Sequence, residues 1–357
     1  MQLVGRTHEW QTLLDRWRGA QRGHASFVLI EGEAGIGKTR LGEELLEWVN
    51  RQGIPTARTR SYAAEGSLAY APVIEWLRSD TLQERFENLD VAWQTEIARL
   101  LPELLSANPQ IPHPEPLIEQ WQRQRLFEAL ARLVTAGGRP TLLLIDDLQW
   151  SDQETLEWLR YLLRFDPAVP LLIVGTARPE EIGPEHPLHT LANEVRSGRQ
   201  LATISLAPLT REETRSLAEQ VCGEALGEPA SERLYAASEG YPLFIVEMVR
   251  AGYHEQAYVD EAEVGPAAPD AGLPPKVYAV IQSRLAGLSP KTRKLASLAA
   301  TIGRSFDYEL LLTASDESED AVAYGLDELW QRRIINEQGI NAYDFSHDRI
   351  RDVAYAE

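Results

Sequence analysis

The segment from residue 32 to residue 39 constrains this chain more than any other. It reads Gly-Glu-Ala-Gly-Ile-Gly-Lys-Thr, a complete G-x-x-x-x-G-K-[ST] pattern. The apolar run Phe27–Ile30 before it predicts a buried strand, and residues 41–46 after it predict the start of a helix. In a strand–loop–helix unit of this kind, glycines let backbone N–H groups form a nest for phosphate at a helix N-terminus. The segment therefore predicts a phosphate-binding loop in a nucleotide-binding α/β fold.

Lys38 stands out against the composition of the chain. There are four lysines against 31 arginines, and Lys38 is the only lysine before Lys276. A lysine provides a compact point charge, whereas arginine provides a planar fork. We expect Lys38 to neutralise the β- and γ-phosphates of a nucleotide, and the Thr39 hydroxyl to bind Mg²⁺.

The overall composition is that of a soluble globular protein. Of 357 residues, 44% are hydrophobic and 25% are charged. The longest apolar runs are strand-length, and the N-terminus lacks the pattern of a signal peptide. We therefore expect a cytoplasmic protein with no membrane partner. The net charge of −19 makes direct nucleic-acid binding by this segment unfavourable.

Strands and helices alternate in the first part of the chain, which predicts a parallel sheet with helices on both faces. Residues 1–207 are therefore predicted to form a P-loop NTPase core. The expected strands are residues 26–31, 57–62, 141–146, 171–176 and 201–206.

The pattern changes after Pro208. Helical periodicity continues to about Gly252, and a stretch rich in Ala, Gly, Pro and acidic residues follows. Later helices, then two short extended pieces around Gly339 and a last helix, predict a winged-helix domain. The expected domains are the core at 1–207, an all-α lid with a linker at 208–270, and the winged helix at 271–357. The last predicted helix has no cap or breaker before residue 357, so we expect a piece of a longer protein.

Two acids follow the third expected strand. Asp146 and Asp147 come directly after Leu142–Ile145, and carboxylates at the carboxyl end of a parallel strand face the ligand crevice. We expect Asp146 to hold Mg²⁺ through water, and Asp147 to orient or deprotonate the attacking water.

The fourth strand ends in Thr176, and Arg178 follows. Both residues are candidates to sense a γ-phosphate from the strand next to Asp146. Asp152, in contrast, is predicted to cap the next helix, because an apolar-periodic run begins directly after it.

These motifs, in this order, resemble the signal transduction ATPases with numerous domains (STAND), and more closely the large ATP-binding, maltose-activator-like bacterial regulators. The resemblance covers residues 3–357. The matching segments are Val4-Gly5-Arg6 with Glu9, Glu31–Arg40, Leu144–Asp152, Thr176–Pro179, Glu239–Phe244 and Phe345–Arg349.

The resemblance implies ATP or ADP with Mg²⁺ as cofactors. It assigns adenine contacts to the backbone near Val4, Gly5 and Arg6, and γ-phosphate sensing to Arg178. It also implies that Pro242 contacts the adenine from the lid, and that His347 reaches the β-phosphate of ADP and locks a closed state. The expected nucleotide-binding residues are Val4, Gly5, Arg6, Gly32, Ala34, Gly35, Ile36, Gly37, Lys38, Thr39, Arg40, Pro242 and His347.

The resemblance predicts a nucleotide switch that hydrolyses ATP slowly, is closed with ADP and self-associates with ATP. The sensor and effector domains usual in the family would lie outside this chain. One alternative is a hexameric AAA+ motor, which needs an arginine finger that no segment announces. A second is a DNA-binding winged helix with a structural nucleotide. The acidic run Asp316–Asp320 and the net charge oppose it, and the basic residues that support it are Lys276, Arg284, Lys291, Arg293 and Lys294.

Overall fold

The computed structural model describes residues 3–62, 68–117, 120–252, 275–332, 334–338 and 341–356. The chain divides into two compact units, one of residues 2–207 and one of residues 208–357. Among the described residues, no helix is long and apolar enough to cross a membrane.

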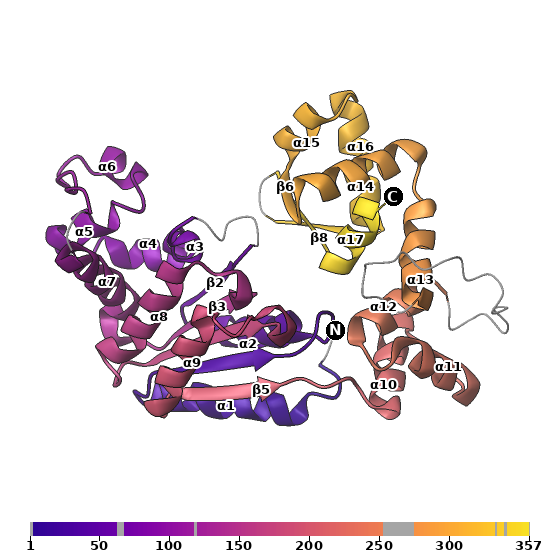
Figure 1. Cartoon of the computed structure of the whole chain (residues 1–357), viewed down its shortest axis with the longest axis horizontal. Helices are drawn as coiled ribbons and strands as arrows, with labels where there is room; N and C mark the ends of the chain where they lie inside the picture. Colours follow the sequence, from indigo (N-terminus) through magenta and orange to yellow (C-terminus); the bar gives the residue numbers. More distant parts are fainter. Residues whose placement is uncertain are drawn as a thin grey trace. The chain divides into compact units, whose positions relative to one another are not determined.

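The first unit contains a parallel sheet in the order β2-β3-β4-β1-β5 (Figure 1). Because β4 lies between β1 and β3, the loop after β1 and the acids after β3 are separated by the end of β4. The strands are β1 Ser26–Glu31, β2 Thr56–Arg60, β3 Thr141–Asp146, β4 Leu171–Ala177 and β5 Leu201–Ser205.

Helices cover both faces of this sheet. Helices α1 and α2 contact one face, and α3, α8 and α9 belong to the apolar cluster on the other. The α-helices are α1 Thr7–Gln21, α2 Lys38–Asn50, α3 Ala71–Leu77, α4 Asp80–Phe86, α5 Val91–Ile97, α6 Glu103–Ala107, α7 Gln120–Thr135, α8 Gln153–Phe165 and α9 Pro187–Ser197. Short 3₁₀ turns lie between these elements: η2 Ala136–Gly138 after α7, η3 Leu148–Trp150 before α8, and η4 Pro179–Glu181 before α9.

The central strands are buried throughout. Every residue of β3 and of β4 is buried, as expected for strands covered on both faces. Side chains of a strand alternate between the faces. The strand side chains on one face of the sheet include Leu143, Ile145 and Ile173. They belong to the same apolar cluster as Trp76 of α3 and Trp158 of α8. The predicted fold class, a P-loop NTPase sheet flanked by helices, is therefore confirmed.

Helix positions follow local sequence signals. The Asp152 carboxylate accepts hydrogen bonds from the Thr155 backbone N–H at 2.8 Å and the Tyr70 backbone N–H at 2.9 Å. Asp152 thus caps α8, as the sequence predicted, and also ties α8 to the segment before α3.

The second unit begins with helices and continues into a small sheet. A capping box of Thr210 and Glu213 starts α10. The three short strands form an antiparallel sheet in the order β6-β8-β7. The elements are α10 Arg211–Cys222, α11 Glu228–Ser238, α12 Pro242–Arg250, α13 Pro275–Ala286, α14 Pro290–Ile302, β6 Ser305–Asp307, α15 Tyr308–Ala314, α16 Glu319–Gln331, β7 Ile335–Glu337, β8 Ala342–Phe345 and α17 Asp348–Ala356.

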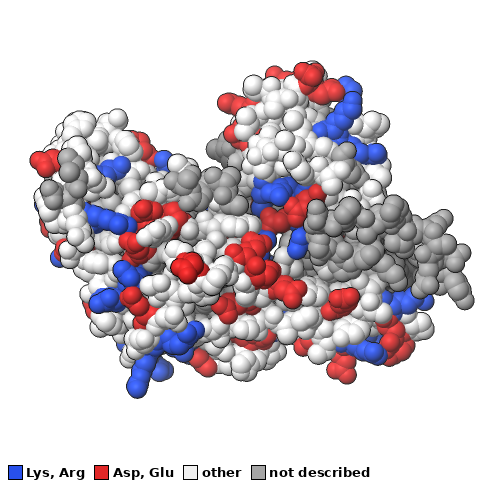
Figure 2. Space-filling view, in the orientation of Figure 1, with Lys and Arg blue, Asp and Glu red and all other residues white. Residues whose placement is uncertain are grey.

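The three-domain division stays a prediction, since most of the expected linker, including residues 253–274, lies outside the described residues, as does Gly339. On the face shown in Figure 2, acidic and basic side chains of the described residues alternate in small groups, without a continuous basic area.

Candidate nucleotide site at the carboxyl edge of the sheet

The loop between β1 and α2 has the backbone shape of an anion nest. Gly37 has φ 101° and is the N-cap of α2, a left-handed conformation that allows successive N–H groups to converge on one anion. At Gly32, φ is 152°, and an added Cβ would lie 3.1 Å from the Leu206 carbonyl oxygen. Both positions therefore require glycine.

Lys38 is buried at the base of this loop. Its ammonium donates to the carbonyl oxygens of Gly32 at 2.7 Å and Glu33 at 2.9 Å. Burial lowers the pKa of Lys38, the Arg178 charge lowers it further, and Asp147 opposes both effects. A phosphate placed in the nest would favour the charged ammonium, as the sequence analysis expects.

The segment before α1 is anchored to the phosphate loop. Arg6, which is 7% exposed, donates to the Ile36 carbonyl oxygen at 3.1 Å and forms an ion pair with Glu9 at 3.5 Å. The chain at Gly5 takes φ 67° to reach this position. The structure thus brings Arg6 to the loop, while the adenine contacts of Val4, Gly5 and Arg6 stay a prediction.

Asp146 collects hydroxyl donors from two neighbouring elements. Thr39 Oγ1 lies 3.0 and 2.9 Å from the two carboxylate oxygens, and Thr176 Oγ1 also donates to Asp146. Asp146 is 1% exposed. One hydroxyl and one carboxylate beside a phosphate nest are a donor set that suits Mg²⁺, which takes its other ligands from phosphates and water. Within the described residues, no group of three or more His, Cys, Asp or Glu side chains is arranged to hold a metal without a nucleotide.

Asp147 is held between two arginines. It is 3% exposed and forms ion pairs with Arg60 and with Arg178, whose Nε lies 3.3 Å from Asp147 Oδ1. Gln149 donates to the same oxygen at 3.1 Å, and the Asp147 N–H donates to Thr176 Oγ1 at 2.9 Å. Asp147 has φ 58°, a rare conformation for a residue with a side chain. The network thus fixes a strained acid at the edge of the sheet.

Arg178 is also constrained. It pairs with Glu181 at 2.9 Å, and its guanidinium carbon lies 4.8 Å from the centre of the Trp150 ring. Arg178 thus contacts Asp147, which directly follows Asp146 in the chain, and the hydroxyl of Thr39, next to Lys38, donates to Asp146. The predicted catalytic residues Lys38, Asp146, Asp147 and Arg178 therefore belong to one cluster.

Arg60 is the residue that the sequence analysis missed. It ends β2, is paired in register with Asp146 of β3, and is 8% exposed. Its backbone N–H donates to Glu75 at 3.2 Å. In the sequence, Arg60 is only an arginine at the carboxyl end of a strand. Its place beside the two acids follows from the pairing of β2 with β3.

Three other predicted residues lie away from this cluster or outside the first unit. Arg40 pairs with Glu44 at 2.6 Å on α2. Pro242 begins α12, and His347 precedes α17, where its Nδ1 accepts from the Arg349 N–H at 3.2 Å. Their nucleotide contacts stay predictions. Among the remaining loop residues, Ala34 is 8% exposed and Ile36 is 1% exposed.

Comparison with known proteins agrees with this geometry. Residues 2–174 match the sequence model of the AAA ATPase domain. An uncharacterized protein of Rhizobium meliloti (strain 1021) is 24% identical over 388 residues, covering 99% of this chain and 35% of that protein. The chain thus spans about a third of the length of this relative.

Among solved structures, the chain resembles a STAND protein with a tetratricopeptide repeat sensor from Pyrococcus horikoshii. The TM-score is 0.53 at 18% identity, covering 99% of this chain and 42% of that one. A Walker-type ATPase of Pyrococcus abyssi gives a TM-score of 0.44 at 16% identity, covering 99% and 96% of the two chains. At 18% identity the first likeness shows the fold. Residues 2–174 therefore match an AAA ATPase domain, and this match includes the phosphate loop, Arg60, Asp146 and Asp147, while Arg178 lies four residues beyond it.

Proposed function

We propose that this chain is the nucleotide-binding module of a STAND-type signalling regulator, which hydrolyses ATP slowly and uses ADP and ATP as off and on signals. The observation that carries the proposal is the position of Asp147, the expected base, between Arg60 and Arg178. The name of the Pyrococcus horikoshii protein and the order of motifs along the chain support it.

The residues of the loop provide the phosphate contacts. Lys38 and the backbone N–H groups after Gly37 would bind the phosphates of ATP or ADP. When Mg²⁺ is bound, the Thr39 hydroxyl and the Asp146 carboxylate would hold it, and it would neutralise developing charge on the phosphates. Thr176 belongs to β4, the strand between β1 and β3, and its hydroxyl donates to Asp146 and so orients this carboxylate.

The Asp147 carboxylate is already occupied in its present arrangement. One oxygen pairs with Arg60 and the other with Arg178 and Gln149, so both oxygens have partners that compete with a water molecule. A γ-phosphate would compete for Arg178 and Arg60, because it also carries negative charge. Asp147 would then be released to orient or deprotonate the attacking water. Hydrolysis is therefore linked to γ-phosphate sensing, and we expect it to be slow.

The switch follows from the same competition. ATP differs from ADP only in the γ-phosphate, so the differential affinity for two conformations must come from groups that contact it. In the ADP state, Pro242 and His347 would hold the second unit closed over the diphosphate. In the ATP state, the first unit would become available for self-association. Sensor and effector domains would be supplied outside this chain.

The Arg60→Gln variant tests the proposal. Without Arg60, the Asp147 oxygen that pairs with it is freed to orient the attacking water, so ATP turnover should rise several-fold, whereas Arg60→Lys should stay closer to the original rate. Steady-state phosphate release with ATP and Mg²⁺ measures this.

The unmodified chain should turn over well below the ~1–10³ s⁻¹ typical of enzymes. A rate within that range would favour the AAA+ motor instead. Turnover in Arg60→Gln as low as in Asp147→Asn would show that Arg60 does not restrain the acid.

A further inference from the structure

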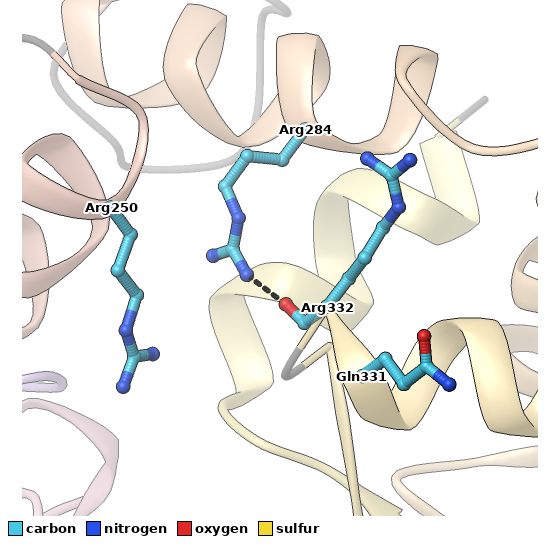
Figure 3. A pocket seen from close by; sticks show the side chains of 4 residues that line it. All are labelled: Arg250, Arg284, Gln331 and Arg332. Atoms are coloured by element: carbon cyan, nitrogen blue, oxygen red, sulfur yellow. Dashed lines mark hydrogen bonds between the residues drawn. The ribbon is translucent and has the colours of Figure 1, made fainter.

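A small basic pocket lies within the second unit, among α12, α13 and α16 (Figure 3). Its volume is about 280 Å³, and its described lining residues are Arg250, Arg284, Gln331 and Arg332. Three of these four side chains are cationic, in a chain with 54 acidic and 35 basic residues. In Figure 3, Arg284 lies between Arg250 and Arg332, and each arginine comes from a different helix or helix end.

Two described carboxylates form ion pairs with the lining arginines. Glu247, which is 1% exposed, pairs with Arg284 and lies 3.3 Å from Arg250 Nη1. Arg332 Nε lies 3.7 Å from Glu328. Arg284 also donates to the Arg332 carbonyl oxygen at 2.6 Å, which fixes its guanidinium at the end of α16. Among the described residues, Glu247 thus pairs with both Arg250 and Arg284, and Arg332 adds a third guanidinium group to the pocket lining.

The positive charge of Arg332 repels that of Arg284. Burial lowers the pKa of Arg284 to about 10, and the nearby charge of Arg332 contributes to this lowering. An anion between the two guanidinium groups would replace this repulsion with attraction.

We propose that this pocket binds the phosphate group of a small anion, at a site separate from the nucleotide loop. Guanidinium groups match phosphate through parallel N–H···O bonds. The volume lies near the lower end of the ~300–1,000 Å³ range of ligand pockets, which fits a small phosphorylated molecule better than a large one. A ligand that bridges the three arginines would hold α12 against α13 and the end of α16.

Calorimetric titration of the full chain with inorganic phosphate tests the site. The titration is done in a Lys38→Ala background, so that phosphate has lost its main side-chain partner in the nucleotide loop. Adding Arg250→Gln and Arg332→Gln should weaken the affinity by about ten-fold or more. This pair leaves Arg284 as the partner of Glu247, so no buried carboxylate loses its last cation. The matched control replaces Arg211 and Arg215 of α10, which lie outside the pocket, by Gln and should leave the affinity unchanged.

Glycerol phosphate distinguishes the sources of the phosphate group. Tighter binding of this ester than of inorganic phosphate would identify a phosphorylated metabolite, and the reverse would identify free phosphate. With either ligand, hydrogen exchange should slow at α13 and at the end of α16, but not in the pocket variant.

Equal affinity in the pocket and control variants, or no saturable binding of either ligand, would overturn the proposal. So would a duplex oligonucleotide that binds through these arginines while both small ligands fail to bind, because the site would then recognise a nucleic-acid backbone.

Discussion

Arg60 and Arg178 approach the Asp147 carboxylate from the ends of two different strands. All three groups are at most 8% exposed. Removing one partner from a buried ion network leaves an uncompensated charge and typically costs ~3–5 kcal/mol. Asp147 also keeps a φ of 58°, which costs on the order of 1–2 kcal/mol for a side-chain-bearing residue. Because these contacts hold Asp147 in an unfavourable backbone conformation, we infer that Asp147 has a functional role.

The Lys38→Ala variant should lose nucleotide binding, because the phosphates lose their main side-chain cation. We expect the affinity for both ATP and ADP to fall on the order of 10²-fold or more in calorimetric titrations. Lys291→Ala, which removes an exposed lysine paired with Glu317, is the matched control and should bind as the parent does. Unchanged affinity in the Lys38 variant would mean that the nucleotide binds elsewhere.

The Asp147→Asn and Asp146→Asn variants should separate two roles. Asp147→Asn removes the base and one negative charge, so ATP·Mg²⁺ should bind with little loss while hydrolysis slows roughly 10²-fold or more. Asp146→Asn should instead weaken the Mg²⁺-dependent part of the affinity, because a carboxylate that suits Mg²⁺ is lost. Titrations with and without Mg²⁺, combined with turnover rates, check both. If the two variants have the same profile, the roles are assigned wrongly.

At the scale of elements, close packing of η3 on β4 positions the acid. A Cβ added at Gly175 would lie 2.2 Å from Leu148 Cδ1 and 3.1 Å from Phe27 Cζ. Leu148 directly follows Asp147 and is fully buried. The short turn that carries Asp147, Leu148 and Gln149 can therefore approach the sheet only over a glycine.

The Gly175→Ala variant should be less stable by ~1–3 kcal/mol, since overpacking forces Leu148 or β4 to move. For a unit of this size, this loss lowers the Tm by ~2–4 °C per kcal/mol. Gly183→Ala is the control, because an added Cβ has no atom within 4 Å, and it should shift stability by no more than ~0.5 kcal/mol. Calorimetric melting of both variants checks this. Equal melting temperatures would show that η3 tolerates the extra methyl group.

The sequence predicted those elements and site residues whose signals are local. Strand β3 has the bounds expected for residues 141–146, because its apolar run is a signal of a few adjacent residues. The cap at Asp152 was predicted for the same reason. Helix α9 was missed although Leu188, Leu191 and Val195 give it an apolar face, and β6 has only three residues and shows no periodicity.

The missed part of the site depends on contacts between residues far apart in the sequence. Arg60 and Asp147 are separated by 87 residues, and no spacing in the sequence connects them. The contact arises because β2 pairs with β3, so that Arg60 is opposite Asp146. Thr176 was predicted as a candidate sensor, but its hydrogen bonds to both Asp146 and the Asp147 backbone depend on the β3–β4 pairing.

At the scale of the whole molecule, the chain carries a net charge of −19 and spans about a third of its Rhizobium meliloti relative. Self-repulsion at this charge opposes association of like copies. Any oligomer formed with ATP must therefore gain surface that the ADP state does not offer.

Mass measurement by light scattering, at matched concentrations and with Mg²⁺, tests the central claim most directly. The account predicts a monomer with ADP and a larger mass with a slowly hydrolysed ATP analogue, because in the proposed switch only a γ-phosphate would draw Arg60 and Arg178 away from Asp147. The Lys38→Ala variant should stay monomeric with both nucleotides. An identical mass for the parent with ADP, with the analogue and without nucleotide would contradict the switch and leave a static nucleotide-binding module.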